Sequence, residues 1–439
     1  MDTLALLQKY DRPVPRYTSY PTAVHFNQEI RQGKYKGLLQ SLSANMPISL
    51  YIHIPFCHIL CHYCGCNTKV ANTYSPVKQY VQTLLKEIEL AGKELPNKMP
   101  VSHLHFGGGS PNFLESDDLK AIMELLNQYF IFDKDAEIAM ETDPRLLNKE
   151  KIETLSELGF TRISLGVQDF NQTVQEAVNR VQPFDQVKAS VDNLRNHGID
   201  KINFDLMIGL PLQTLDSVRQ SVKQAISLDP DRLAIFAYAH VPWMKKHQKL
   251  LEKYPMPDGN LRYDMVGCVK ETLEKSGYRA IGIDHFAREY DSIYQIYKQG
   301  KLRRNFQGYT NDQASTILGF GISSISMFED VYVQNTIDAP TYRQVVENGE
   351  FPITRGRILN QEDIKRRNII EQIMCGYEVD ISKYPLEKKM LEELEKDEIV
   401  EIKDNHVKIA DQGWAYARIA ASCFDEYYQP QEGQHARAI

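Results

Sequence analysis

The sequence predicts an α/β fold, a partial (β/α)6 barrel with an N-terminal arm and a C-terminal, mostly helical, winged-helix-like domain. Three observations lead to this prediction. From about residue 48, short apolar strands alternate with amphipathic helices, which is typical of βαβ units and a parallel sheet. About six such units are present, fewer than the eight of a closed barrel. After residue 340 the pattern changes to helices with one small hairpin.

Strands and helices of the predicted barrel follow one another along the chain without long gaps. Each strand is a short apolar run, and each helix has apolar residues at helical spacing. The strands are expected over residues 49–55, 102–106, 137–141, 162–166, 201–207 and 232–238. The helices between them are expected over residues 76–95, 115–130, 148–158, 184–197 and 214–228. Loops at the carboxyl ends of such strands build the site of these folds, so we expect the site there.

The chain divides into three predicted regions. These are an N-terminal arm over the active site at 1–47, the barrel with an extension at 48–340, and a C-terminal helical domain at 341–439. The arm is polar and contains prolines, which is typical of a peripheral segment rather than a core element.

The C-terminal region is expected to hold three helices and one hairpin. The helices cover residues 362–376, 386–396 and about 411–427, and the hairpin strands cover residues 398–402 and 406–409. Such winged-helix-like units often bind DNA, but the helix over 386–396 is slightly acidic, and a recognition helix needs cationic groups for phosphates. A lid or scaffold role is therefore favoured.

Composition and charge indicate a cytoplasmic protein. The chain of 439 residues is 42% hydrophobic and 25% charged, as in ordinary globular proteins. Its net charge of −7 argues against broad binding to nucleic acid or to an anionic membrane. No run resembles a signal peptide or reaches the length of a membrane span. We expect a cytoplasmic monomer with no nucleic-acid or membrane partner.

Four cysteines lie within ten residues, at Cys57, Cys61, Cys64 and Cys66. The first three have the spacing C-x3-C-x2-C. Three thiolates can bind three irons of a four-iron cluster and leave the fourth iron open for chemistry. Because the whole chain has only seven cysteines, this spacing is a signal rather than an accident.

Two other interpretations of the cysteines are weaker. A disulfide is disfavoured because a cytoplasmic compartment keeps thiols reduced. A structural zinc site usually needs four ligands in two pairs, and no second pair follows at zinc-finger distance. His58 and His62 could serve as ligands, although loop residues beside the cluster are the simpler interpretation. Iron–sulfur binding is thus favoured over zinc.

Further polar or glycine residues fall at the ends of predicted strands. Gly107–Gly109 follow the second strand and allow close approach of the backbone to a ligand. Glu141 and Asp205 end apolar strands, where each could cap the next helix or accept hydrogen bonds from a ribose or an ammonium group. Gln168 and Arg180 flank a short helix, and Arg180 could equally be a surface cation.

Several runs of the sequence resemble the radical S-adenosylmethionine superfamily and, within it, the family of oxygen-independent coproporphyrinogen III oxidases. The superfamily motif is Tyr51-Ile52-His53-Ile54-Pro55-Phe56-Cys57 with the two cysteines that follow it. The closer resemblance includes Arg16-Tyr17-Thr18-Ser19-Tyr20-Pro21-Thr22, Gly107-Gly108-Gly109-Ser110-Pro111, Gly166-Val167-Gln168-Asp169-Phe170, Asp284-His285-Phe286-Ala287 and Asn305-Phe306-Gln307-Gly308-Tyr309-Thr310. It covers nearly the whole chain apart from the tail Gln429–Ile439. It implies a partial barrel of radical-SAM type.

The resemblance also implies a reaction. Family members bind a [4Fe-4S] cluster and S-adenosyl-L-methionine, with two molecules of the latter implied here. A 5′-deoxyadenosyl radical takes hydrogen from a propionate side chain, carbon dioxide leaves, and a vinyl group forms. Two propionates of coproporphyrinogen III react to give protoporphyrinogen IX. A small electron-donor protein such as flavodoxin or ferredoxin is the implied partner.

Roles for single residues follow from the same resemblance. The metal ligands are Cys57, Cys61 and Cys64. The first S-adenosylmethionine is held by Tyr51, Gly108, Glu141 and Ile325. The second is surrounded by Tyr63, Gly109, Ser110, Gln168, Arg180, Asp205 and Ala239, with Phe306 and Gln307 near the same pocket. The residues expected to be catalytic are Tyr51, Glu141 and Cys66, the last facing the site without binding iron. Tyr63 and Ser110 replace the phenylalanine and threonine that the family usually carries.

The four propionates of the substrate call for cations, and arginine matches a carboxylate with two parallel hydrogen bonds. Arg16, Arg303 and Arg304 lie in or beside family runs and are the candidates, with solvated surface arginines as the alternative. Two rival functions share the fold: a haem-binding chaperone and a radical enzyme that opens haem and transfers a methyl group. The arm at Arg16–Thr22 and the run Asn305–Thr310 favour the oxidase.

Overall fold

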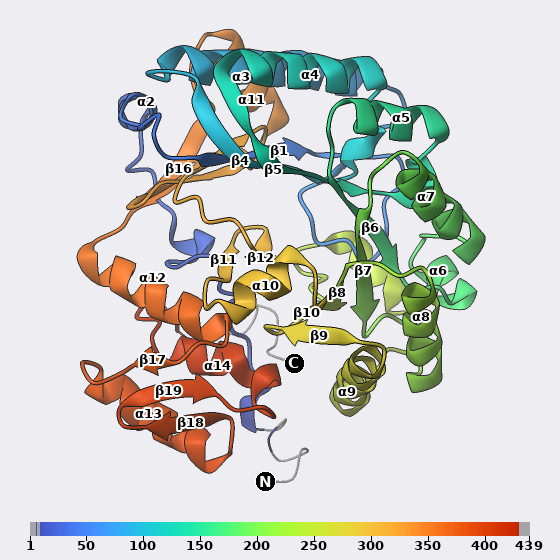
Figure 1. The fold of residues 1–439 in the computed structure, drawn as a ribbon, viewed down its shortest axis with the longest axis vertical. Coiled ribbons are helices and arrows are strands. Elements are labelled where there is room, and N and C mark those ends of the chain that lie inside the picture. The colour runs from blue at the N-terminus through green and yellow to red at the C-terminus, as the bar shows by residue number, and fades with distance from the viewer. Residues whose placement is uncertain (1–5, 7–8, 430–439) are drawn as a thin grey trace.

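The fold is described from a computed structural model, which places residue 6 and residues 9–429. Six strands lie side by side and parallel in chain order, and they curve around an interior (Figure 1). They are β1 (Ile48–Ile54), β4 (Met99–Gly108), β5 (Phe130–Thr142), β6 (Arg162–Gln168), β7 (Lys201–Ile208) and β8 (Arg232–Ala237). The predicted α/β partial barrel is confirmed, and its strands extend the predicted ones by a few residues at most ends.

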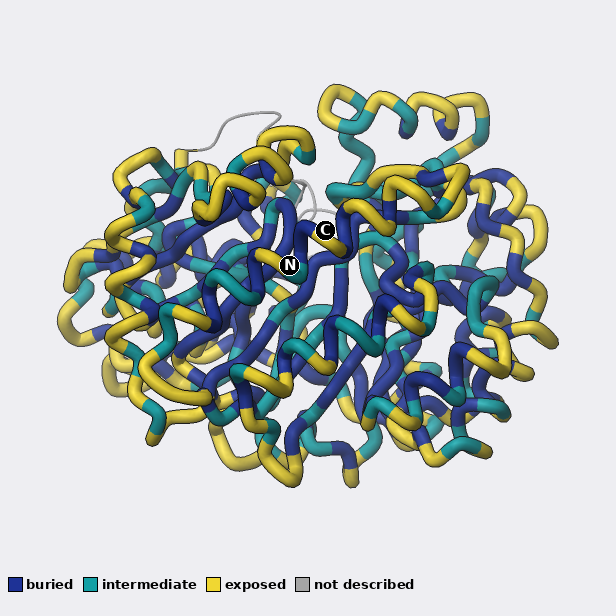
Figure 2. Tube along the Cα trace, turned by 90° about the horizontal axis from the view of Figure 1, so that it is seen from above, coloured by how far each residue is buried: buried dark blue, intermediate teal, exposed yellow. Residues whose placement is uncertain are grey.

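Helices cover the outer face of these strands. They are α3 (Ser75–Glu94), α4 (Ser116–Tyr129), α5 (Lys149–Glu157), α7 (Phe184–Asn196) and α8 (Leu215–Ser227). Their first turns are held by local caps, such as Asn148 for α5 and the reciprocal Thr214–Ser217 pair for α8. Figure 2 shows buried strands inside and exposed helix faces outside. The apolar core between the two layers fixes the strand ends that carry the site.

Smaller elements connect or extend this framework. The helices are α2 (Gln32–Gln40), α6 (Gln172–Ala177), α9 (Gly259–Lys275) and α10 (Ser292–Lys298). The short strand pairs are β2 (Phe56–Cys57) with β3 (Lys69–Val70), and β11 (Arg303–Asn305) with β12 (Gly308–Thr310). The first pair holds the start of the cysteine loop, and the second forms a hairpin over the open side of the barrel.

The sheet continues beyond the six parallel strands at both ends. On one side lie β13 (Ile317–Phe320), β14 (Ile325–Met327), β15 (Val331–Asn335) and β16 (Ile353–Ile358); on the other lie β10 (His285–Arg288) and β9 (Tyr278–Ile281). The complete 12-stranded order is β16-β15-β14-β13-β1-β4-β5-β6-β7-β8-β10-β9. β13 pairs parallel to β1. Because β16 belongs to this sheet, and α11 (Ala339–Glu347) packs on α3, we propose that the C-terminal domain begins near residue 360 rather than 341.

The C-terminal unit has its own hydrophobic core. Its helices are α12 (Gln361–Met374), α13 (Pro385–Lys396) and α14 (Ala417–Ser422). Its strands are β17 (Val379–Asp380), β18 (Val400–Lys403) and β19 (His406–Ile409), in the order β17-β19-β18. Ile373, Leu391 and Ile419 pack together at its centre. The unit lies below the open side of the barrel in Figure 1.

The N-terminal arm belongs to the same core. Tyr10, Val14, Tyr17 and Tyr20 are buried in it, and the Tyr17 hydroxyl donates a hydrogen bond to Asp425 at 3.1 Å. The expectation of a peripheral arm is therefore wrong for this stretch. Its aromatic residues supply apolar surface that a small unit of three helices and short strands needs in order to fold.

The last predicted helix, 411–427, is also wrong in length. Residues Trp414–Tyr416 form a 3-10 turn and α14 ends at Ser422. Beyond it the chain turns back to the arm, where the Tyr428 hydroxyl donates a hydrogen bond to the Pro13 carbonyl at 2.7 Å. Tertiary contacts thus replace helical hydrogen bonds here. The tail from residue 430 onward lies outside the described residues.

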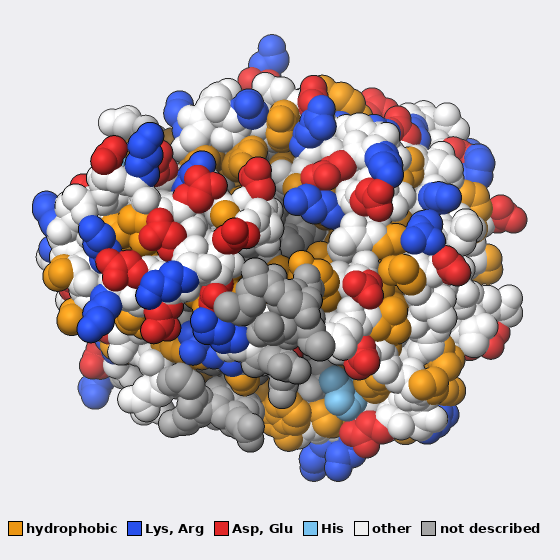
Figure 3. Space-filling view, turned by 90° about the horizontal axis from the view of Figure 1, so that it is seen from below, with side chains coloured by type: hydrophobic (Ala, Val, Ile, Leu, Met, Phe, Trp, Pro, Cys, Tyr) orange, Lys and Arg blue, Asp and Glu red, His pale blue; other side chains and the backbone are white. Residues whose placement is uncertain are grey.

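One face of the molecule carries charges of both signs. Figure 3 shows acidic and basic side chains interspersed over one face of the molecule, including the part formed by the C-terminal unit. Recognition of a phosphate backbone needs clustered cations instead. Within the described part of the chain, no helix is long and apolar enough to span a bilayer.

Candidate active site

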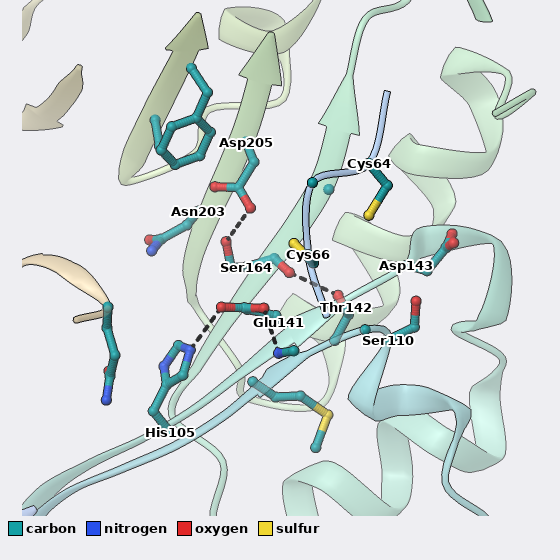
Figure 4. A pocket seen from close by; sticks show the side chains of 18 of the residues that line it. Cys64, Cys66, His105, Ser110, Glu141, Thr142, Asp143, Ser164, Asn203 and Asp205 are labelled. Carbon is teal, nitrogen blue, oxygen red and sulfur yellow. Dashed lines mark hydrogen bonds and ion pairs between the residues drawn. The ribbon is translucent and has the colours of Figure 1, made fainter. Parts of the chain in front are cut away.

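A cavity of about 700 Å³ runs from the carboxyl ends of the barrel strands into the barrel interior. The cysteine loop, the Gly108–Ser110 turn and the ends of β5, β6, β7 and β8 form its wall. Many polar side chains point into it, as Figure 4 shows for Glu141, Asp205 and Cys66. The sequence predicted a site at this edge, because parallel strands present their carboxyl ends together.

The three cysteines of the C-x3-C-x2-C motif all line this cavity. Cys57 lies at the end of β2, where the Ser110 hydroxyl points at its sulfur at 3.7 Å. Cys61 is buried, and its sulfur lies 3.5 Å from a guanidinium nitrogen of Arg180. Burial raises the pKa of Cys57 to about 11, so this thiol ionises most readily when a metal is present.

The donor set fits an iron–sulfur cluster better than a single metal ion. Among residues 9–429, no three His, Cys, Asp or Glu side chains are arranged to bind one ion. A four-iron cluster asks for a different arrangement, because each of three thiolates binds a separate iron. Three thiols on one loop that share one cavity wall meet that requirement.

Cys66 differs from the other three. It is exposed at the cavity wall, and its thiol hydrogen-bonds to Cys64. This hydrogen bond lowers the pKa of Cys64 to about 6 and raises the pKa of Cys66 well above its ordinary value. Cys66 thus lines the cavity as predicted, and that it does not bind iron stays a prediction.

A loop after β8 holds the cysteine loop in place. Lys245 donates a hydrogen bond to the Cys66 carbonyl at 2.8 Å, and His247 Nε2 lies 2.8 Å from the Cys64 carbonyl. Gln248, which is buried, donates to the Tyr63 carbonyl at 2.9 Å. Sequence reasoning missed this loop, because its partners are backbone groups almost two hundred residues away.

The glycine run packs the cysteine loop against β4. The N–H groups of Gly109 and Ser110 donate to the carbonyls of Ile54 and Phe56, both at 2.8 Å. A Cβ on Gly109 would lie 2.6 Å from the Phe56 carbonyl oxygen and 3.0 Å from the Cys57 sulfur. The N–H groups predicted to approach a ligand are therefore used within the protein. The absence of side chains at this turn instead lets Cys57 sit directly over β4.

Glu141 is held in the cavity by two donors. His105 Nε2 lies 3.2 Å from one carboxylate oxygen, and the Gly108 N–H donates to the other at 3.2 Å (Figure 4). Burial opposes ionisation, yet these hydrogen bonds lower the pKa of Glu141 below its ordinary value. Its side chain is 44% exposed to the cavity. A charged carboxylate in a fixed orientation therefore faces any ligand.

Asp205 provides a second carboxyl group in the same cavity. It accepts a hydrogen bond from the Ser164 hydroxyl at 3.3 Å (Figure 4). Burial, and then the charge of Glu141, raise the pKa of Asp205 to about 7. One carboxyl is thus ionised over the whole neutral range, while the other titrates within it.

Arg180 connects the cysteine loop to the end of β6. It is buried, and it donates to the Gly166 carbonyl at 2.6 Å and to Asp143 at 3.2 Å. Gln168, whose φ of +67° lies in the left-handed region, stands beside it on the cavity wall. The alternative of a surface cation is wrong for Arg180.

The structure brings most of the predicted site residues to the cavity wall. These are Cys57, Cys61, Tyr63, Cys64, Cys66, Gly108, Gly109, Ser110, Glu141, Gln168, Arg180, Asp205, Ala239 and Gln307. Their individual roles stay predictions.

Three predicted residues do not form the wall. Tyr51 lies behind it, stacked on His105 at 6.0 Å between ring centroids. Phe306 packs edge-on against Tyr332, and Ile325 belongs to the same apolar cluster. All three are partly exposed, and their contacts with a ligand stay predictions.

His105 is the functional candidate that the sequence reasoning missed. It lies on the strand predicted over 102–106, at an alternate position to the apolar side chains on either side. Period-two alternation places such a residue on the inner face of the barrel, and this signal could have identified it.

We expect binding of S-adenosylmethionine to weaken by about tenfold as the pH falls from about 8 to about 6. Asp205 takes up a proton with a pKa of about 7, and the neutral carboxyl no longer attracts a cationic ligand. Equilibrium binding across this pH range checks the expectation. Asp205→Asn should abolish most of the pH dependence, and Asp200→Asn, at an exposed position just before β7, should retain it. An identical pH profile in Asp205→Asn would contradict the assignment.

Comparisons with known proteins agree with this geometry. A family model described as the Radical SAM superfamily matches residues 51–225. The oxygen-independent coproporphyrinogen III oxidase of Bradyrhizobium diazoefficiens is 39% identical over 437 residues, which cover 97% of each chain. The Escherichia coli protein of the same name is 37% identical, covering 97% of this chain and 95% of its own. A solved structure of coproporphyrinogen III oxidase from Escherichia coli matches 97% of this chain and 99% of its own, with 36% identity and a TM-score of 0.91.

A parallel partial barrel with three thiols at the carboxyl edge is the arrangement of a radical S-adenosylmethionine protein, and the family model covers the barrel strands from β1 to β7. The similarity to the curated relatives extends over nearly the whole chain. The chain therefore belongs to the family of oxygen-independent coproporphyrinogen III oxidases. A [4Fe-4S] cluster and S-adenosylmethionine are accordingly its cofactors.

Proposed function

We propose that this protein catalyses the anaerobic oxidative decarboxylation of two propionate side chains of coproporphyrinogen III to vinyl groups, giving protoporphyrinogen IX. The observation that carries the proposal is the cavity itself, in which three thiols and an oriented carboxylate share one wall. Full-length similarity to proteins named for this reaction supports the choice of substrate.

Cys57, Cys61 and Cys64 are the residues that would hold the cluster. When bound, the cluster and S-adenosylmethionine supply the 5′-deoxyadenosyl radical that removes a hydrogen atom from the substrate. Glu141 presents a fixed negative charge to the cationic cofactor, and His105 keeps that carboxylate in place. The hairpin of β11 and β12 and the N-terminal arm cover the open side of the cavity and limit access of water.

A second S-adenosylmethionine has a suitable environment on the same wall. Asp205, Ser110 and Gln168 supply polar groups that could accept or donate hydrogen bonds, and Arg180 supplies a buried cation. We propose that these groups contact a second S-adenosylmethionine, separate from the molecule next to Glu141.

The partners follow from the chemistry. Reduction of the cluster needs a one-electron donor, and we propose a small electron-donor protein such as flavodoxin or ferredoxin. The three cluster thiols must stay reduced, which favours the cytoplasm. A monomer suffices, because the cavity wall is formed by one chain.

An anaerobic assay of the reconstituted protein tests the proposed function. With coproporphyrinogen III, S-adenosylmethionine and a reductant, we expect product masses lower by one and then two formic-acid equivalents, together with released carbon dioxide. Omission of S-adenosylmethionine is the control and should leave the substrate unchanged. Tight binding of haem without vinyl formation would favour the haem-chaperone alternative instead.

A further inference from the structure

We propose that Arg16, Arg304 and Arg418 form a carboxylate-binding subsite for a propionate group of the substrate. The proposal rests on the proposed function and makes its substrate contact specific. The three arginines come from the N-terminal arm, from β11 and from α14. Arg16 lines the edge of the cavity together with His285, Gln307 and Tyr309, and Arg304 and Arg418 lie next to Arg16 behind this wall.

Arg304 contacts both Tyr309 and the backbone of Arg16. Its guanidinium lies 4.3 Å from the centre of the Tyr309 ring, and Nη2 donates to the Arg16 carbonyl at 3.2 Å. The residue is only 8% exposed. Its Nε and Nη1 atoms find no hydrogen-bond partner among the described residues. Two buried donors on one charged side chain are costly unless hydrogen-bond acceptors satisfy them.

Three cations lie close together in this cluster. Arg418 is buried and donates to the Val14 carbonyl at 3.2 Å. Burial, and then the charges of Arg16 and Arg304, lower the pKa of Arg418 to about 10. Asp284 is the acid that faces them, and its carboxylate is already 2.6 Å from His285. An additional carboxylate would relieve the repulsion among the three cations.

Ligand chemistry points to a propionate. A carboxylate accepts strong charge-assisted hydrogen bonds from a guanidinium, and Arg304 has two nitrogens that have no partner among the described residues. The substrate carries four such groups on short flexible arms, and only two of them react. A propionate held at the edge of the cavity, away from the cysteine loop, would therefore place a different propionate near the reacting centre.

Arg303 does not belong to this subsite, although the sequence offered it as a candidate. It forms an ion pair with Glu371 at 2.7 Å. The charge of Arg303 is thus satisfied within the protein. It serves as a matched control for Arg304, its neighbour on the same strand.

Binding of coproporphyrin III to the holoenzyme tests the subsite. This stable oxidised porphyrin has the same four propionates, and its tetramethyl ester has none free. Arg304→Gln and Arg16→Gln should each raise the Kd for coproporphyrin III by about tenfold or more, since one charged hydrogen-bonded contact is lost. Arg418→Lys keeps the positive charge but loses the planar guanidinium, so it should raise the Kd for coproporphyrin III by less. Arg303→Gln should leave it unchanged, and no variant should alter binding of the ester.

Two outcomes would overturn the proposal. One is an unchanged Kd in both Arg304→Gln and Arg16→Gln, and the other is an equal loss of affinity for the ester. Because Arg16 is exposed, its variant should keep the fold and the cluster absorbance even if a substitution at Arg304 does not. Failure of the proposed function looks different, as a wild-type protein that binds coproporphyrin III but forms no vinyl product.

Discussion

Replacement of Cys57, Cys61 or Cys64 by serine is expected to abolish the iron–sulfur cluster and all production of vinyl groups. Each of these thiols lines the cavity, and a serine hydroxyl is a much poorer ligand for iron. Loss of one ligand from a site that supplies only three leaves the cluster without a stable attachment. Iron and sulfide content, the cluster absorbance and product mass under anaerobic conditions measure the effect.

Cys66→Ser is the matched control on the same loop. We expect it to retain about the full iron content of the wild type, because Cys66 acts as a hydrogen-bond donor to Cys64 rather than as a ligand. Cys268→Ser, at a buried position on α9, controls for thiol loss elsewhere. Loss of iron from the Cys66 variant would show that the fourth cysteine is a ligand after all.

Replacement of Glu141 by glutamine should lower kcat/KM by about 100-fold or more, which corresponds to about 2.7 kcal/mol of transition-state stabilisation. The substitution removes the negative charge that His105 and the Gly108 N–H hold in the cavity. Anaerobic kinetics and equilibrium binding of S-adenosylmethionine together measure the effect. Most of the loss should appear as weaker binding of the cofactor.

Two variants make the Glu141 result specific. Glu124→Gln, at an exposed position on α4, should leave the kinetics unchanged. His105→Gln should lower kcat/KM by about tenfold, because a positioning residue is lost while the carboxylate remains. A Glu141→Gln enzyme with normal cofactor affinity and normal turnover would refute the assigned role.

The secondary structure of the barrel could be predicted because its signals are local. Helix α8 begins at a cap formed by Thr214 and Ser217, and its apolar residues recur at helical spacing. Strand β7 alternates buried and partly exposed residues over Lys201–Ile208. Where local signals and tertiary contacts disagree, as over residues 411–427, the tertiary contacts determine the structure.

The candidate site was largely predictable for a topological reason. Cys57, Glu141 and Asp205 are far apart in sequence, but Cys57 follows β1, Glu141 lies next to the end of β5, and Asp205 lies three residues before the end of β7. Parallel strands of one sheet have their carboxyl ends at the same edge. The order of strands in the sequence is therefore enough to predict that these side chains lie close together. Gln248, which acts through a backbone carbonyl of the distant cysteine loop, carries no comparable signal in one sequence.

The sequence by itself determined the barrel and the three thiols and two carboxyl groups that share one cavity. Hydrophobic periodicity, helix caps and the spacing of the cysteines are properties of residues close in sequence. They do not depend on how the elements pack together. Only the tertiary structure decided that the N-terminal arm lies in the C-terminal core and that Arg16, Arg304 and Arg418 converge. Those contacts join residues about 110 to 400 positions apart, such as Arg418 and Val14. They depend on which apolar surfaces remain uncovered after the barrel has formed, and this is a property of the whole fold.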